Sequence, residues 1–310
     1  MPLWIPIAFT AVVLWVTENL IDKYLLEKYR HDGDSDTDAN TLFMFSALFA
    51  LPTALFALIM GVHFNITFIE ASAAVIAGLL NGIYLLLYLY AIAKTELSRT
   101  IPFFQSIPFF TAFFGWILLR ETLTHTQLIA GLFITAGAFM LSYHVQNKSF
   151  RFRPTMLILG ASAAIALQFT LFKYTALNTS YWTSVFWSSL GLICMGLFVY
   201  GISKRSRIHI QHIFIKKEYR IIVINLLNEF VDNLAMFTFL FATLLGPIAL
   251  VQTVNAYQPI LLLCATFLLT KFGYDFLKED TSSTTFAQKA LGILLIGIGS
   301  AFIYVPLIRV

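Results

Sequence analysis

IIVINLLNEFVDNLAMFTFLF, residues 221–241, is long and apolar enough to cross a bilayer as one helix. It also carries Asn225, Asn228, Glu229 and Asp232, whose spacings of three and four residues place them on one helix face. A carboxylate at mid-membrane costs about 3 kcal/mol on insertion scales, so such a face turns toward protein or a water-filled cavity. We expect this face to line a pathway; the alternative is that the four groups only hydrogen-bond neighbouring helices.

The composition indicates a membrane protein with several spans. Of 310 residues, 59% are hydrophobic and 12% are charged, against about 25% charged in an average soluble domain. The basic residues lie between apolar segments, so the net charge of +4 does not indicate a nucleic-acid partner. Cys194 and Cys264 lie inside apolar segments and are expected to be buried small hydrophobic residues.

Ten segments have about the 20 mostly apolar residues that a spanning helix needs. They are residues 4–22, 42–62, 70–93, 100–119, 126–144, 155–175, 182–202, 220–244, 247–271 and 288–308. We therefore predict an all-α polytopic protein with no soluble domain. The first segment has no basic n-region or cleavage pattern, so it is expected to be a spanning helix and not a signal peptide. The expected location is the bacterial inner (plasma) membrane.

Other predicted spans also carry polar or aromatic residues. These residues are Trp15 and Glu18 in the first, Asn81, Tyr84 and Tyr88 in the third, Gln105 in the fourth, and Gln252 and Asn255 in the ninth. Singly, each is more often an interhelical hydrogen bond than a ligand contact. Together with the acidic face of 221–241, they predict a shared cavity that binds substrate. Glu18, Glu229 and Asp232 are the candidates for proton exchange, because burial favours the neutral form of an acid.

Prolines fall inside two predicted spans, at Pro102, Pro108 and Pro259. Proline removes a backbone hydrogen bond and bends a helix. Such bends serve either as gates or as fixed kinks, and both alternatives remain open.

The chain contains an internal repeat. A constant offset of 151 residues relates Pro108 to Pro259 and Asn81 to Asp232, and an offset of 150 relates Lys23 to Lys173. This predicts two five-helix units, residues 1–146 and 147–310. Because five is odd, the second unit enters the membrane inverted, and inverted repeats are typical of secondary transporters that hold substrate near the midplane.

Two motifs of the first half resemble a known family. IPFFQSIPFF (101–110) and LLRETLTHTQLIAG (118–131), with a glycine six residues further on, are similar to an EamA repeat of the drug/metabolite transporter superfamily. The resemblance implies a basket of ten helices, in which the first four of each half surround a central cavity and the fifth and tenth stand aside. It also implies movement of metabolites, often export, without ATP.

Charged residues outside the spans bear on two further points. All Lys and Arg residues except Arg120, Lys173 and Arg309 lie in loops after odd-numbered spans, which predicts both termini outside, whereas the resemblance implies both inside. Arg120 and Glu121, after the fourth span, are expected to anchor a turn and not to contact substrate.

Buried carboxylates beside tyrosine and tryptophan suit a cationic or zwitterionic solute, because an ammonium pairs with an acid and lies over aromatic faces. We therefore expect a secondary transporter of an amino acid, polyamine or quaternary amine, proton-linked or not. The alternative is a flippase for a lipid-linked amine or sugar. An enzyme is disfavoured, because the six histidines lack metal-ligand spacing, and no cofactor or metal is expected. A monomer and a homodimer both remain open.

Overall fold

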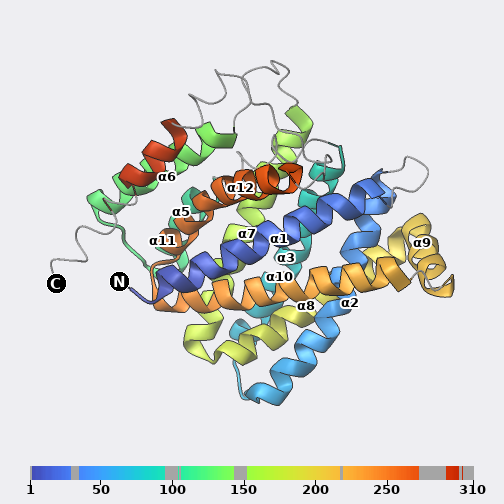
Figure 1. Cartoon of the computed structure of the whole chain (residues 1–310). Coiled ribbons are helices and arrows are strands. Elements are labelled where there is room, and N and C mark those ends of the chain that lie inside the picture. Colours follow the sequence, from blue (N-terminus) through green and yellow to red (C-terminus); the bar gives the residue numbers. More distant parts are fainter. Residues whose placement is uncertain are drawn as a thin grey trace.

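The structure is a computed structural model that describes residues 2–28, 35–94, 104, 106–142, 152–216, 219–271, 291–299 and 302. Within these ranges all regular structure is helical and there is no strand (Figure 1). Six of the helices are long and apolar enough to cross a membrane. They are α1 (Trp4–Lys28), α2 (Ser35–Gly61), α3 (Phe68–Lys94), α7 (Phe152–Asn178), α8 (Tyr181–Ile202) and α10 (Tyr219–Leu245).

The other four predicted spans coincide with shorter or interrupted helices. These are α5 (Ile107–Leu119), α6 (His125–Ser142), the series α11 (Ile248–Thr253), η1 (Val254–Tyr257) and α12 (Gln258–Lys271), and a helical stretch at 291–299. Of this set, α5 begins late for a physical reason, since Pro108 lies in its first turn, where the missing N–H of proline is not needed. Pro108 therefore lies at the start of α5.

The ninth predicted span is discontinuous. Between α11 and α12 the chain narrows to a 3₁₀ turn over Val254–Tyr257, and the N–H of Gln258 binds the carbonyl of Asn255. Pro259 has no N–H to give to that carbonyl, so the regular bonding pattern of an α-helix cannot continue through this point. The sequence predicted one span over 247–271 with a proline bend at Pro259, and the structure divides this segment into α11, η1 and α12.

One helix was not predicted. α9 (Lys204–Ile215) lies in a stretch rich in basic and polar residues that was assigned to a loop. Ile210 and Ile213 are buried on one of its faces, and Phe214 packs 5.8 Å from Phe45 of α2, measured between ring centroids. Packing of this face stabilises a helix that its composition does not reveal.

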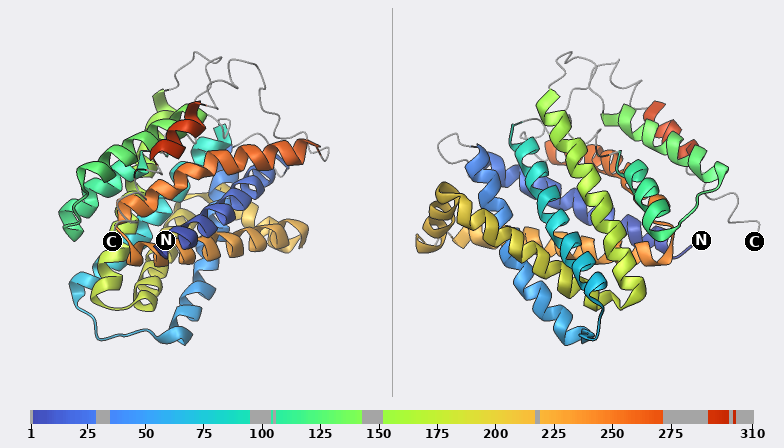
Figure 2. Two further views of the ribbon diagram at one scale, coloured as in Figure 1. Left: turned by 60° about the vertical axis from the view of Figure 1, so that its left-hand side comes forward. Right: turned by 180° about the vertical axis from the view of Figure 1, so that it is seen from behind.

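The long helices pack in pairs that join distant parts of the chain: α1 lies along α10, α3 along α7, and α2 along α8 (Figures 1 and 2). α3 also crosses α8 at very close range. A Cβ atom on Gly78 would lie 1.8 Å from the carbonyl oxygen of Ser188, and one on Gly191 would lie 2.1 Å from that of Val75. Only glycine permits this approach of two backbones.

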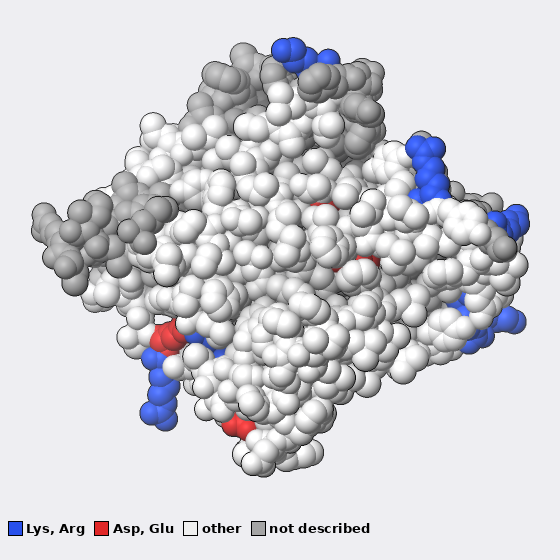
Figure 3. Space-filling model, turned by 60° about the horizontal axis from the view of Figure 1, so that its bottom comes forward, with Lys and Arg blue, Asp and Glu red and all other residues white. Residues whose placement is uncertain are grey.

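α6 and the stretch 291–299 pack on each other at the edge of the bundle (Figure 1). Gly137 and Gly299 make the contact, since a Cβ atom on either would come within 2.7 Å of the opposite helix. Most of the face in Figure 3 is uncharged, with Lys and Arg mainly at its edges and a few acidic atoms near its centre.

Candidate functional site

A cavity lies between the long helices. The centre of a water molecule can move through about 130 Å³ of it, where roughly 10–15 Å³ is enough for one water. Each of the six long helices contributes to its lining, together with Phe104, Ile107 of α5, and the α11–η1–α12 series. Neither α6 nor 291–299 contributes a lining residue. The cavity is therefore large enough for a small organic molecule.

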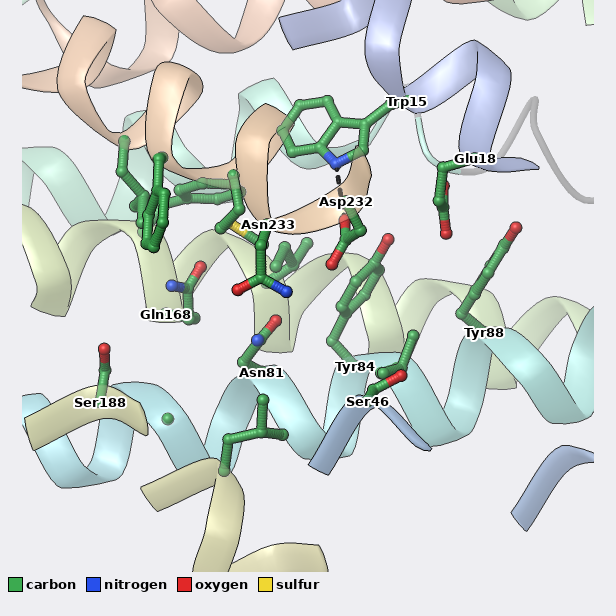
Figure 4. Close-up of a pocket in the computed structure, with 18 of the residues that line it drawn as sticks. Trp15, Glu18, Ser46, Asn81, Tyr84, Tyr88, Gln168, Ser188, Asp232 and Asn233 are labelled. Carbon is green, nitrogen blue, oxygen red and sulfur yellow. Dashed lines mark hydrogen bonds between the residues drawn. The ribbon is translucent and has the colours of Figure 1, made fainter. Parts of the chain in front are cut away.

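Carboxyl groups gather at one end of the cavity (Figure 4). Asp232 accepts a hydrogen bond of 3.0 Å from the indole Nε1 of Trp15, and Glu229 accepts one of 2.6 Å from the Ser46 hydroxyl. Glu18 lies beside them. Within the described part of the chain, none of these acids forms an ion pair. Like charges in a poorly solvated space repel, and a bound cation relieves that repulsion.

Aromatic rings line the same end. The rings of Tyr84 and Tyr88 stack with centroids 6.1 Å apart and planes 15° from parallel, and Phe104 stands 5.8 Å from Tyr88. Trp15 packs 4.9 Å from Phe239. Aromatic faces attract ammonium groups by about 0.5–2 kcal/mol, so the rings and the acids favour the same kind of ligand.

Further side-chain amides line the cavity, and among them Gln168 and Asn81 lie away from Glu18 (Figure 4). Gln168 is 3% exposed, and its amide makes no hydrogen bond to any described residue. Asn255 donates to Gln252 at 2.7 Å, which leaves Gln252 Nε2 and Asn255 Oδ1 without partners in the described structure. A buried polar group without a partner costs about 1–3 kcal/mol, so water or ligand is expected to satisfy these amides.

Most of the predicted polar and aromatic residues line this cavity: Trp15, Glu18, Asn81, Tyr84, Tyr88, Glu229, Asp232, Gln252 and Asn255. Asn225 and Asn228 do not, although both are buried. Asn225 donates to the Ile221 carbonyl of its own helix, and Asn228 donates to Asp22 at 2.8 Å. These two residues hold α10 in its own geometry and against α1, so their expected place in the cavity lining was wrong.

Gln105 and Pro102 lie outside the described residues, as does the side chain of Pro259. Gln168 was not identified from the sequence. A single glutamine in an apolar helix resembles an interhelical hydrogen bond, but the repeat held a signal, because Gln168 stands 150 residues after Glu18, the same offset that relates Lys23 to Lys173.

Glu121 and Lys173 form an ion pair of 2.5 Å, and the Lys173 side chain is 6% exposed. The second oxygen of Glu121 accepts the N–H of Ile248 at 2.8 Å, and Lys173 donates to the Gly246 carbonyl at 2.7 Å. The pair therefore joins the end of α5, the C-terminal part of α7 and the turn between α10 and α11. These contacts are structural, and Glu121 anchors more of the protein than the turn it follows.

Comparison with known proteins gives a family and a fold. The model of the EamA-like transporter family matches residues 2–143. A solved structure described as "Crystal structure of protein" is 15% identical, with a TM-score of 0.66, over 99% of this chain and 98% of that chain, which is a likeness of fold. No curated protein sequence matches significantly. The first half of this integral membrane protein, residues 2–143, thus matches the EamA-like transporter family, which is part of the drug/metabolite transporter superfamily.

Proposed function

We propose that this membrane transporter is a secondary carrier of a small cationic or zwitterionic metabolite, such as an amino acid, polyamine or quaternary amine, and that it works by alternating access. The acidic end of the cavity carries this proposal. Glu18, Glu229 and Asp232 face a space lined by Tyr84 and Tyr88, with no lysine, arginine or histidine among the described lining residues. A cavity of this kind binds an ammonium group better than an anion.

The packing of the helices supports a division into two five-helix repeats, residues 1–146 and 147–310. The second repeat is inverted in the membrane, and the two together give ten spans. The repeat offset relates α1 to α7 and α3 to α10. A two-fold axis in the membrane plane would then exchange the pair α1–α10 with the pair α7–α3, and both pairs are closely packed. The same axis would pass between α2 and α8, which also pack together. In transporters of this type the substrate lies at the interface of the repeats.

The discontinuous α11–η1–α12 series supports a carrier as well. Substrate sites of secondary transporters are often built at interrupted helices, where polar backbone lines a cavity instead of lipid. Asn255 lies in the 3₁₀ turn and faces the cavity beside Gln252. Pro259, directly after this turn, and Pro108, at the start of α5, remain our proposed gating positions, because each adjoins a helix end that borders the cavity.

We further propose that transport is linked to protons through the acids of the cavity. Glu229 is the residue to change first, because its main side-chain contact is one hydroxyl, that of Ser46. Glu229→Gln preserves the shape and can keep that hydrogen bond, but it removes the titration. In proteoliposomes loaded with a radiolabelled amine, we expect the variant to lose pH-dependent flux.

The matched control is Glu70→Gln. Glu70 begins α3 outside the cavity and accepts the Thr67 N–H at 2.9 Å, a capping role that glutamine also fills. This variant is expected to transport normally. Normal flux with unchanged pH dependence in Glu229→Gln would show that the proton role of Glu229 is wrong. Movement of a lipid-linked amine, without flux of any soluble amine, would show a flippase instead of a solute carrier.

A further inference from the structure

The two ends of the cavity are related by the internal repeat. The offset of 150 that pairs Lys23 with Lys173 also pairs Glu18 with Gln168, and the offset of 151 pairs Asp232 with Asn81. Two of the three cavity acids thus correspond to the amide of the same length, whereas the offset of 151 pairs Glu229 with Gly78. Glu18 and Asp232 stand on the packed pair α1–α10, and Gln168 and Asn81 stand on the packed pair α7–α3.

At these two pairs of positions the side chains differ in charge and not in size. Glutamate and glutamine have nearly the same shape, as do aspartate and asparagine. Figure 4 shows Gln168 and Asn81 beside Asn233 and Ser188, away from Glu18 and Tyr88. The repeat therefore gives the cavity one anionic end, at Glu18, and one neutral end, at Gln168.

The neutral end has both donors and acceptors to offer. Neither Gln168 nor Asn81 makes a side-chain hydrogen bond to a described residue. A primary amide carries NH₂ donors and a carbonyl acceptor on one rigid group. Such an end matches a carboxamide or hydroxyl, which also donates and accepts.

Two other groups fit this end poorly. A carboxylate accepts only, and no lysine, arginine or histidine lies among the described lining residues to balance its charge. A second ammonium donates only, and the acids that would pair with it are at the opposite end. Charge and hydrogen-bonding capacity therefore disfavour both a carboxylate and a second ammonium at the neutral end.

We infer that the cavity selects a solute with one amine and, at its other end, an uncharged carboxamide or hydroxyl group, and that it discriminates against the matching amino acid and the matching diamine. Gln168 and Asn81 are the specificity-determining residues. This inference rests on the proposed amine-carrier function and, among the amines proposed there, favours monoamines over amino acids and polyamines.

The test measures binding of matched probes to the purified full-length protein by thermal-shift titration, since a ligand that binds only the folded state raises its melting temperature. The first series is leucinamide, leucine and isopentylamine, which share a skeleton. The second is 4-aminobutan-1-ol and 1,4-diaminobutane. Phenylalaninamide and phenylalanine repeat the amide–acid comparison at a larger size.

For the wild type we expect leucinamide to bind at least about tenfold more tightly than leucine, because a site built to hydrogen-bond a group strongly rejects the analogue that cannot match it. Gln168→Leu should reduce the advantage of leucinamide over isopentylamine to within about twofold. Gln168→Glu combined with Asn81→Asp should reverse the preference from the amino alcohol to the diamine. If Gln168→Leu melts well below the wild type without ligand, Asn81→Asp alone supplies the charge test.

Equal binding of leucinamide and leucine to the wild type would overturn the inference, and so would an unchanged amide advantage in Gln168→Leu. If all the amines then bound equally and Glu18→Gln abolished that binding, the amine-carrier proposal would stand while the selectivity inference failed. Binding of none of the amines would overturn both.

Discussion

Removal of the Lys173 ammonium is expected to destabilise the protein strongly, because this charge is almost fully buried among three helical segments. Breaking a buried ion pair by deleting one partner costs about 3–5 kcal/mol. Glu121, which would lose its partner, has a side chain that is 20% exposed and keeps the N–H of Ile248, so water and this donor offset part of the penalty. For Lys173→Met we expect a loss of about 2–3 kcal/mol in the free energy of unfolding.

The assay is reversible unfolding in mixed micelles with increasing denaturing detergent, read out as a double-mutant cycle. Glu121→Gln alone should lose about 1–2 kcal/mol, since its amide oxygen still accepts a hydrogen bond. The double variant should fall short of the sum of the single losses by about 1–2 kcal/mol. Lys204→Met is the control, because Lys204 is exposed at the start of α9, and it should stay within about 0.5 kcal/mol of the wild type.

A coupling energy below about 0.5 kcal/mol between Lys173→Met and Glu121→Gln would refute the reasoning, because the two residues would then not act as a pair. A loss in Lys204→Met as large as that in Lys173→Met would refute it differently. It would show that loss of an exposed positive charge destabilises the protein as much as loss of a buried, paired one.

Four further substitutions test packing and local structure by the same unfolding measurement. Gly78→Ala should cost about 3 kcal/mol or abolish folding, because its methyl group meets a backbone carbonyl of α8, whereas Gly131→Ala, with open space around it, should gain up to about 1 kcal/mol from helix propensity. Ser180→Ala should cost about 1 kcal/mol, since it removes the N-cap hydrogen bond of α8. Trp15→Phe keeps the ring but removes the donor to Asp232, and should cost about 1.5–3 kcal/mol.

The sequence predicted the long helices because each has an uninterrupted apolar run. It failed where a single residue or a tertiary contact decides the outcome. Pro259 interrupts the α-helical hydrogen bonding of the ninth predicted span, because it has no N–H to donate to the carbonyl of Asn255, four residues earlier. α9 forms from a basic stretch because Ile210 and Ile213 find a surface to pack on, and hydropathy alone does not identify that surface.

The polar face of α10 was predicted from helical spacing, but spacing does not say how far along the helix the cavity extends. Asn225 and Asp232 share that face and are separated by seven residues, which is about 10 Å along the axis. Asp232 reaches the cavity and Asn225 lies beyond it. Gln168 escaped prediction because no polar residue lies three or four positions from it in α7, so only the repeat relates it to Glu18.

The glycine contact between α3 and α8 limits how these helices can move. At Gly78 and Gly191 the two backbones touch without side chains between them, and the residues before and after each glycine in both helices are larger. A slide of either helix by one position would bring a side chain into the space that glycine leaves empty. During any opening or closing of the protein, α3 and α8 are therefore expected to travel as one rigid unit, so that the hinges must lie at other helix contacts.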